Sequence, residues 1–423
     1  MNIDNHVIVA GGGVTGLYSA IGAAKAGFEV TLLEKYARVG SRATIFNLAP
    51  TVADSLARLD SFGTELVDGL QPIVRRSSDD TINGMFKIEN VGRTINADGS
   101  RPLTSHAVVD GYTGYDSRAW SRIQIGGVEN HLRSYIERHY PQIDMRFDTT
   151  IAALEQSDRG VRALTNHAAT NTTQVFDGAW LVSATGGRNI VGSQRQLFPE
   201  VAHWVGGRME TVDPSRVELR RVFRDGADLA PETRSLNPAN SGWATVGLPG
   251  TGRLELPDGL IWAQIAHDAR HVPNDALRAV IRDRADLLGM GDVAMREGDD
   301  ALLKVNVQLS LLHDQPAVRG RVLLAGDELL GPYFPTSTGG THGMGVSGPL
   351  VEETLNNLRG ATSFYERSFA LDHYDHTARS EAAKIMEVSR GEMLEDLGLP
   401  RLTWDENLRR LGPAGPGRGN AAP

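Results

Sequence analysis

Three glycines near the N-terminus are the first residues whose type and spacing indicate a chemical role. Gly11, Gly13 and Gly16 form a Gly-x-Gly-x-x-Gly pattern between the apolar segment HVIVA and the small-residue segment LYSAIGAAKAG. In this context the first glycine allows a tight turn, the second lets the backbone approach a pyrophosphate, and the third lets a helix pack close to a strand. The helix N–H groups then face anionic oxygens. The pattern predicts a dinucleotide-binding unit, and a tight turn without a phosphate is the simpler alternative.

A carboxylate follows at a useful distance. A second apolar segment, EVTLLE, ends at Glu34, eighteen residues after Gly16. There it can accept hydrogen bonds from an adenosine ribose. A 2′-phosphate on that ribose would bring two negative groups together, so the pattern favours FAD or NAD. Val14 and Thr15 at the helix start and Lys35 beside Glu34 complete this part of the expected cofactor site.

The chain does not continue with the further strand-helix units of an NAD dehydrogenase. It continues with KYARVGSRATIFNLAP, and much later reads GGRNIVG over residues 186–192 and GDELLGPYFPTSTGGTHGMG over residues 326–345. These segments resemble the class A FAD-dependent monooxygenases of the para-hydroxybenzoate hydroxylase fold. The amino-acid sequences of these segments are most similar to the monooxygenase domain of MICAL proteins. The resemblance covers roughly residues 5–60, 118–190 and 320–358.

The resemblance implies that FAD is the bound cofactor. Asp327, at the end of RVLLAGD, would accept a hydrogen bond from a ribityl hydroxyl, and the loop Pro335–Gly343 would offer N–H groups to the flavin ring and pyrophosphate. A family arginine before a helix matches Arg122, with Arg118 as the second register and helix capping as the simpler role. Gln124 is a neighbouring candidate. The implied FAD contacts are Arg42, Ala43, Arg122, Asp327, Pro335, Thr338, Gly339, Gly340, Thr341, His342 and Gly343.

The resemblance also implies a reaction. NADH or NADPH would reduce FAD, and the reduced flavin would react with dioxygen to form a flavin hydroperoxide that hydroxylates or epoxidises a small or medium-sized organic substrate. His342 and Tyr333 are the candidate catalytic residues because they flank the loop that would touch the ring. A histidine at a helix start is disfavoured in its cationic form by the helix dipole. The simpler alternatives are a capping histidine and a packing tyrosine.

Large side chains of the middle region are the candidates for a substrate pocket. Trp243, Trp262 and His267 lie in segments typical of strands, and Phe334 lies in the loop before Pro335. Core packing is the alternative for these residues. An aromatic or apolar substrate would suit such a lining.

One departure from the family bears on function. Thr185 or Gly186 stands in LVSATGGRNIVG where these monooxygenases usually have an aspartate thought to serve FAD and NAD(P)H binding. The missing carboxylate puts the use of NAD(P)H in question more than the binding of FAD. Two other functions therefore stay open, an FAD-dependent dehydrogenase or reductase and a non-catalytic flavin-binding protein.

The composition of the chain excludes several classes of partner and site from the prediction. The 423 residues carry 43 basic and 52 acidic side chains, a net charge of −9, and no long basic run, so nucleic acid is not an expected partner. The chain has no cysteine, no HExxH or GxSxG motif and no histidine cluster, so neither a metal site nor a hydrolase triad is expected. An apolar run of about 18 residues is missing, and so is an export signal, so we expect a cytoplasmic protein without a membrane span. The sequence does not indicate an oligomeric state.

The candidate residues need an α/β scaffold to position them. We predict a Rossmann-like FAD-binding domain with a parallel sheet and an antiparallel meander over residues 150–183, a discontinuous second domain containing a β-sheet, and C-terminal helices. The predicted FAD-binding domain is 1–65, 118–190 and 306–358. The predicted substrate domain is 66–117 and 191–305. A helical region over 359–410 and a disordered tail over 411–423, rich in glycine, proline and alanine, complete the chain.

Overall fold

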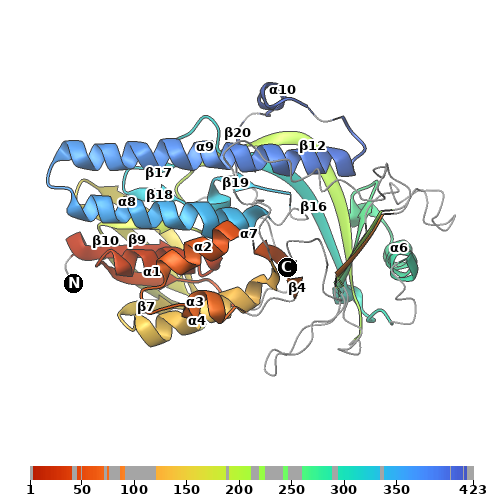
Figure 1. The fold of residues 1–423 in the computed structure, drawn as a ribbon, viewed down its shortest axis with the longest axis horizontal. Helices are drawn as coiled ribbons and strands as arrows, with labels where there is room; N and C mark the ends of the chain where they lie inside the picture. Colours follow the sequence, from red (N-terminus) through yellow and green to blue (C-terminus); the bar gives the residue numbers. More distant parts are fainter. Residues whose placement is uncertain are drawn as a thin grey trace.

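The computed structural model describes residues 3–40, 45–48, 50–70, 74–75, 86–90, 121–186, 190–210, 219–223, 242–245, 260–287, 294–333, 338–400, 402–412 and 414–416. It has a parallel sheet covered by helices and a second, mostly antiparallel sheet, and the long helix α9 runs over both (Figure 1). This mixed α/β architecture confirms the predicted fold class.

A six-stranded sheet forms the centre of the first region, in the order β17-β18-β11-β1-β2-β7. Its strands are β1 (His6–Ala10), β2 (Glu29–Leu33), β7 (Ile143–Arg146), β11 (Trp180–Ser183), β17 (Val318–Arg319) and β18 (Val322–Leu324). Every pair is parallel except β17 with β18. Because β1 lies between β2 and β11, the strand order reverses at β1, and the carboxyl end of β1 is the switch point where such sheets bind ligands.

Helices cover this sheet. The helix α1 (Val14–Lys25) connects β1 to β2, α4 (Ile125–His139) precedes β7, and α8 (Gly348–Gly360) packs against α1. The α1–α8 contact is close, since a Cβ atom added at Gly22 would lie 2.9 Å from Cβ of Glu352. Two shorter helices, α2 (Pro50–Leu59) and α3 (Glu65–Asp68), follow β2 along the chain.

Two three-stranded sheets belong to the same half of the molecule. The strands β8 (Thr149–Ser157), β9 (Gly160–His167) and β10 (Thr172–Gly178) form the predicted antiparallel meander between β7 and β11. The other sheet has the order β3-β6-β4, with β3 (Ile45–Leu48), β4 (Val74–Arg75) and β6 (Ser121–Gln124). The second sheet therefore places two segments that resemble the flavin monooxygenases side by side.

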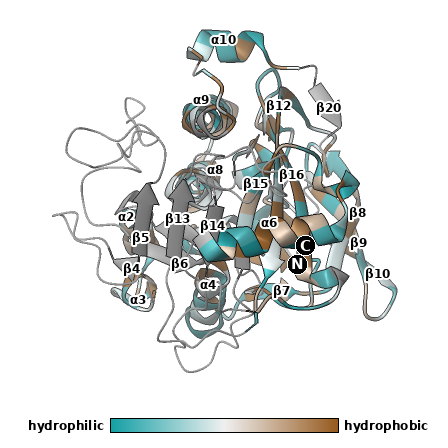
Figure 2. Ribbon diagram, turned by 90° about the vertical axis from the view of Figure 1, so that its right-hand side faces the viewer, coloured by the Kyte–Doolittle hydropathy of each residue, from teal (hydrophilic) through white to brown (hydrophobic). Residues whose placement is uncertain are grey.

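An eight-stranded sheet forms the second region, in the order β19-β16-β12-β15-β14-β13-β5, with β20 beside β12. Its strands are β5 (Phe86–Asn90), β12 (Gln194–Arg208), β13 (Leu219–Phe223), β14 (Gly242–Thr245), β15 (Leu260–Ile265), β16 (Leu302–Leu311), β19 (Leu330–Gly331) and β20 (Ala414–Pro416). The helix α6 (Asn274–Leu287) lies across one face (Figure 2) and buries Leu277, Val280 and Ile281 in a separate core.

The C-terminal part is helical, as predicted, and ends differently. The helices are α9 (Phe364–Asp396) and α10 (Trp404–Arg409). Ala414–Pro416, within the predicted disordered tail, pairs with β12 through antiparallel contacts with Gln194, Arg195 and Gln196. The prediction is corrected for these three residues, because the glycine-rich composition gave no sign of an open strand edge to pair with. Among the described residues, no helix combines the length and apolar character needed to cross a bilayer.

Candidate functional site

The glycine turn at the carboxyl end of β1 has the geometry that its sequence predicts. Gly11 has a φ of 105°, and a Cβ atom there would lie 2.3 Å from the carbonyl oxygen of Ala184. A Cβ atom on Gly16 would lie 1.8 Å from the carbonyl oxygen of Gly11. Gly13 is the N-cap residue of α1 and has no side chain to accept a hydrogen bond from the first turn. The first turn of α1 is thus packed against the strand with its N–H groups available to an anion.

Glu34 lies at the same edge. Its side chain is buried, with Oε2 accepting the N–H of Gly12 at 2.5 Å and Oε1 accepting the N–H of Tyr36 at 2.9 Å. The carboxylate therefore joins the turn after β1 to the turn after β2. Its neighbour Lys35 places its ammonium 4.4 Å from the centroid of the Tyr36 ring. The predicted ribose contact through Glu34 stays a prediction, and its position beside the glycine turn supports it.

The second glycine-rich segment packs directly on the first. After β18 the chain makes a 3₁₀ turn at Gly326–Glu328, with a φ of 61° at Gly326. A Cβ atom on Gly326 would lie 2.8 Å from Oγ1 of Thr15, and one on Gly343 would lie 2.2 Å from the same atom. The fold therefore brings two predicted segments, more than 300 residues apart, to the start of α1.

Around the turn lies a set of buried polar groups that sequence reasoning missed. Oε1 of Glu328 accepts hydrogen bonds from Ser183 Oγ at 3.2 Å and from Thr185 Oγ1. Nη1 of Arg195 donates to the carbonyl oxygen of Asp327. Burial lowers the pKa of the Arg195 guanidinium, while the charges of Glu328 and Asp327 act in the opposite direction. Glu328 adjoins the predicted Asp327 and could have been noticed, whereas no local signal pointed to Arg195.

His342 is placed differently from the prediction. It is the last residue of α7 (Thr338–His342), which continues through a π-helical turn, Gly343–Ser347, into α8. The side chain is fully buried, and burial lowers its pKa to about 3. The imidazole is therefore neutral because it is desolvated and not because it begins a helix. Its Nε2 lies 3.3 Å from Ser347 Oγ, and its Nδ1 has no hydrogen-bond partner within the described part of the chain.

Tyr333 sits between the two sheets. It is fully buried, its backbone N–H donates to Ser389 Oγ at 2.6 Å, and its ring centroid lies 6.2 Å from that of Trp204 on β12. Packing, the simpler of the two predicted roles, is what these contacts show. The catalytic role stays a prediction. Trp204 was not singled out in the sequence, because nothing there indicates that it contacts the segment after β19.

The structure places the other candidate cofactor and substrate residues in different ways. Trp262 on β15 is partly buried against Gly206, where a Cβ atom would lie 2.8 Å from its ring. His267 follows β15 in a bend and is exposed, so its prediction as a strand residue is wrong. Arg122, Gln124, Trp243 and Thr338 are placed by backbone only, with Arg122 in β6 opposite Asn47 and Val74. Arg42, Ala43, Arg118, Phe334 and Pro335 lie outside the described residues.

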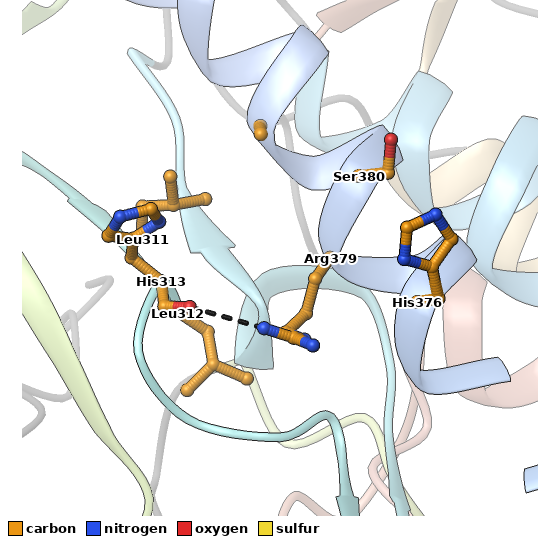
Figure 3. Close-up of a pocket in the computed structure, with 7 residues that line it drawn as sticks. Leu311, Leu312, His313, His376, Arg379 and Ser380 are labelled. Carbon is orange, nitrogen blue, oxygen red and sulfur yellow. Dashed lines mark hydrogen bonds between the residues drawn. The ribbon is translucent and has the colours of Figure 1, made fainter. Parts of the chain in front are cut away.

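A cavity of about 220 Å³ lies elsewhere, between the end of β16 and α9 (Figure 3). It is lined by Leu311, Leu312, His313, His376, Arg379, Ser380 and Ala383. Nη1 of Arg379 donates to the carbonyl oxygen of His313 across it, at 3.4 Å. None of the predicted site residues lines this cavity. Within the described residues, no three His, Asp or Glu side chains are grouped to hold a metal ion.

Residues 6–77 match the DAO family model, described as FAD dependent oxidoreductase. The matched segment contains the glycine turn Gly11–Gly16 and Glu34, so the comparison and the geometry point to the same cofactor segment. No curated protein matches the sequence.

Solved structures share the fold along nearly the whole chain. The p-nitrophenol 4-monooxygenase PnpA from Pseudomonas putida DLL-E4 is 18% identical with a TM-score of 0.62, covering 97% of this chain and 92% of its own. The flavin-dependent monooxygenase PieE, solved with FAD and substrate, is 16% identical with a TM-score of 0.61, covering 97% and 68%. The Diels-Alderase PyrE3 is 18% identical with a TM-score of 0.59, covering 93% and 75%. The fold is that of flavoprotein monooxygenases, and at these identities it does not fix the reaction.

Proposed function

We propose that the protein is an FAD-dependent monooxygenase of a small or medium-sized organic molecule, with NADH or NADPH as reductant. The observation that carries the proposal is the contact of Thr15 with both Gly326 and Gly343. The glycine turn and Glu34 are features that NAD and FAD sites share. A second glycine-rich segment packed on the same helix start supports a longer cofactor that extends from the turn after β1 to α7.

The residues present fit FAD. Side chains at Gly11 and Gly16 would clash with the backbone of Ala184 and Gly11, so the two glycines allow the tight turn and the close helix packing that a pyrophosphate site needs. The first turn of α1 would bind the pyrophosphate, Glu34 the ribose, and the Asp327 and Gly339 region the ribityl chain. When bound, FAD would accept electrons from the reductant and pass them to dioxygen. The protein would orient the flavin against the substrate and exclude water.

We place the substrate on the side of the eight-stranded sheet. The Trp204 and Tyr333 rings join this sheet to the segment that leads from β19 to α7. Trp262, on the neighbouring strand β15, is partly exposed and is an apolar surface for a ring-shaped substrate. The neighbouring PnpA acts on p-nitrophenol by its name, which makes that phenol a reasonable first probe. His342 and Tyr333 remain the proposed catalytic candidates, and class A membership is part of the same proposal.

The test begins with the purified protein. We expect it to be yellow and to release FAD on denaturation. Mixed anaerobically with NADH or NADPH, the flavin absorbance should be lost, and oxygenated buffer should restore it with consumption of dioxygen. With p-nitrophenol and ¹⁸O₂, mass spectrometry should show one labelled oxygen atom in the product of a true substrate.

A second candidate, an FAD-dependent dehydrogenase, is favoured by Thr185, which has a hydroxyl where the family usually has a carboxylate. A flavin that neither nucleotide bleaches, but that an organic substrate does, would replace the monooxygenase with this dehydrogenase. A protein that cannot take up FAD would contradict both.

A further inference from the structure

The Glu328 side chain links the ends of β11 and β18 at the carboxyl edge of the parallel sheet. It is 3% exposed, and its Oε1 accepts hydrogen bonds from the hydroxyl groups of Ser183 and Thr185. Ser183 is the last residue of β11, and Thr185 lies two residues further on. Glu328 ends the 3₁₀ turn that follows β18. The carboxylate therefore fixes that turn against the end of β11.

A buried cation contacts the same turn. Arg195, near the start of β12, is 6% exposed and donates through Nη1 to the carbonyl oxygen of Asp327. A buried guanidinium is costly unless anions balance its charge. Burial lowers the pKa of Arg195, and the negative charges of Glu328 and Asp327 oppose this shift by favouring the cationic form.

The two consecutive carboxylates point to different neighbours. Oδ1 of Asp327 lies 3.1 Å from the position of a Cβ atom on Gly339, so the Asp327 side chain faces α7. Glu328 faces Ser183 and Thr185. If Glu328 lost its charge, Asp327 would be the remaining anion able to balance Arg195, and the attraction would draw it away from α7.

We propose that Glu328 is a positioning residue that balances Arg195 and thereby holds the Asp327 carboxylate toward α7 and the proposed FAD site. Glu328 contacts Thr185, which stands where the monooxygenases that the sequence resembles usually have an aspartate. The turn after β18 therefore supplies a carboxylate beside the position of that aspartate. The inference rests on the proposed FAD site and is independent of the reaction that FAD performs there.

The test measures FAD binding to the full-length apoprotein. Glu328→Gln keeps an acceptor for Ser183 and Thr185 and removes the charge. We expect the Kd for FAD, measured by quenching of flavin fluorescence, to rise about 10-fold to 100-fold, the range of one charged hydrogen bond. Glu328→Asp keeps the charge and should recover part of this loss.

Glu200→Gln is the matched control. Glu200 accepts two hydrogen bonds from the fully buried Arg390, at 2.7 and 2.8 Å, so it also balances a buried guanidinium. Arg390 lies on α9 and also donates a hydrogen bond to Asn407 on α10. We expect Glu200→Gln to lower Tm while the Kd for FAD stays within about twofold of the wild type.

A rescue variant separates positioning from folding. Oγ1 of Thr185 contacts Oε1 of Glu328, so Thr185→Asp in the Glu328→Gln background returns a carboxylate to the same place from the segment after β11. We expect FAD affinity to recover. If Glu328→Gln lowers Tm as Glu200→Gln does but binds FAD like the wild type, Glu328 is structural only and the inference is overturned. A wild-type protein that does not bind FAD would overturn both the inference and the proposed site. FAD binding without oxygen consumption would overturn the proposed reaction alone.

Discussion

At the scale of single residues, His342 differs from its buried polar neighbours. Glu34 and Glu328 accept hydrogen bonds from neighbouring groups, whereas Nδ1 of His342 has no hydrogen-bond partner within the described residues. A buried polar atom without a partner costs about 1–3 kcal/mol. A second cost follows in acid, because the native state resists protonation of this ring.

His342 should make the protein less stable in mild acid. Burial lowers its pKa to about 3 in the folded state, against about 6.5 in an unfolded chain. As pH falls below the unfolded value, the unfolded chain takes up a proton that the native state does not, so stability falls. Between pH 7.5 and 5.5 this one group should cost about 1.4 kcal/mol. Urea unfolding of the wild type and of His342→Gln at the two pH values measures the difference.

The comparison isolates His342 because the other titrating groups are common to both proteins. The wild type should lose more stability than His342→Gln over this interval. Equal losses would mean that the ring is accessible to protons in the native state, and the buried neutral imidazole would be wrong.

The sequence could predict residues whose chemistry is local. Gly11, Gly16 and Glu34 were found because the turn and the two strands that require them are adjacent in the chain. Arg195 was missed because its acceptor, the carbonyl oxygen of Asp327, is 132 residues away. Thr185 was noticed as a departure, but the bond from its hydroxyl to a carboxylate 143 residues away could only come from the fold.

At the scale of elements, the π-helical turn Gly343–Ser347 is the least regular part of the site. Such turns leave backbone groups of the helix ladder without their usual partners and occur often at functional sites. Here Ser55 Oγ on α2 donates to the carbonyl oxygen of Met344 at 2.8 Å, and the Tyr18 hydroxyl on α1 lies 2.7 Å from Ser55 Oγ. The helix α2 thus contacts this turn through Ser55, and α1 supports Ser55 through Tyr18.

Ser55→Ala should weaken this support. It removes the donor to the Met344 carbonyl and leaves a buried acceptor, which should lower the free energy of unfolding by about 1–3 kcal/mol. Urea denaturation followed by tryptophan fluorescence measures the change. Ser61→Ala is the control, since within the described residues its hydroxyl makes a single long contact, 3.5 Å from the Tyr140 hydroxyl, and the change should cost less than about 0.5 kcal/mol. Equal effects would show that Ser55 does not support the turn.

The pattern predicted the regular elements and not this turn. The spacing of apolar residues predicts β1, α1 and β2, and the structure confirms these elements. TGGTHGMG reads as a permissive loop, yet residues 338–360 run through α7, the π-helical turn and α8 without a break. Support from Ser55 and Tyr18, which lie on other elements, provides the contacts that the glycines themselves lack.

At the scale of the whole molecule, α9 joins the two sheets. Its Tyr374 hydroxyl donates to the carbonyl oxygen of Leu324 in the parallel sheet at 2.7 Å. Near its other end, the fully buried Arg390 binds Glu200 on β12 and Asn407 on α10. Sequence periodicity predicted a helix here, but not which strands it would bridge. Likewise β16 (Leu302–Leu311) spans the predicted boundary at residue 306, because apolar alternation does not show which sheet a strand joins.

Arg390→Met should be strongly destabilising. It leaves the Glu200 carboxylate without its buried partner, a change that typically costs about 3–5 kcal/mol. Arg379→Met on the same helix is the control, because Arg379 is 37% exposed and its bond to Asp375 spans one helical turn, so it should cost less than about 1 kcal/mol. Calorimetric Tm values of the two variants measure this. Similar small shifts would mean that Arg390 does not join α9 to β12.

The strands of the parallel sheet lie far apart along the chain, so the ribosome makes them at different times. Its strands come from residues 6–10, 29–33, 143–146, 180–183 and 318–324. On a ribosome that adds about 5–20 residues each second, β1 waits tens of seconds or less for β18 to be made. During that interval the glycine turn has no Gly326 or Gly343 beside it, and the strand edge that β18 will cover is open. The nascent chain thus passes through a stage with an open strand edge, and the two glycine-rich segments of the proposed FAD site can meet only after residue 343 has been made.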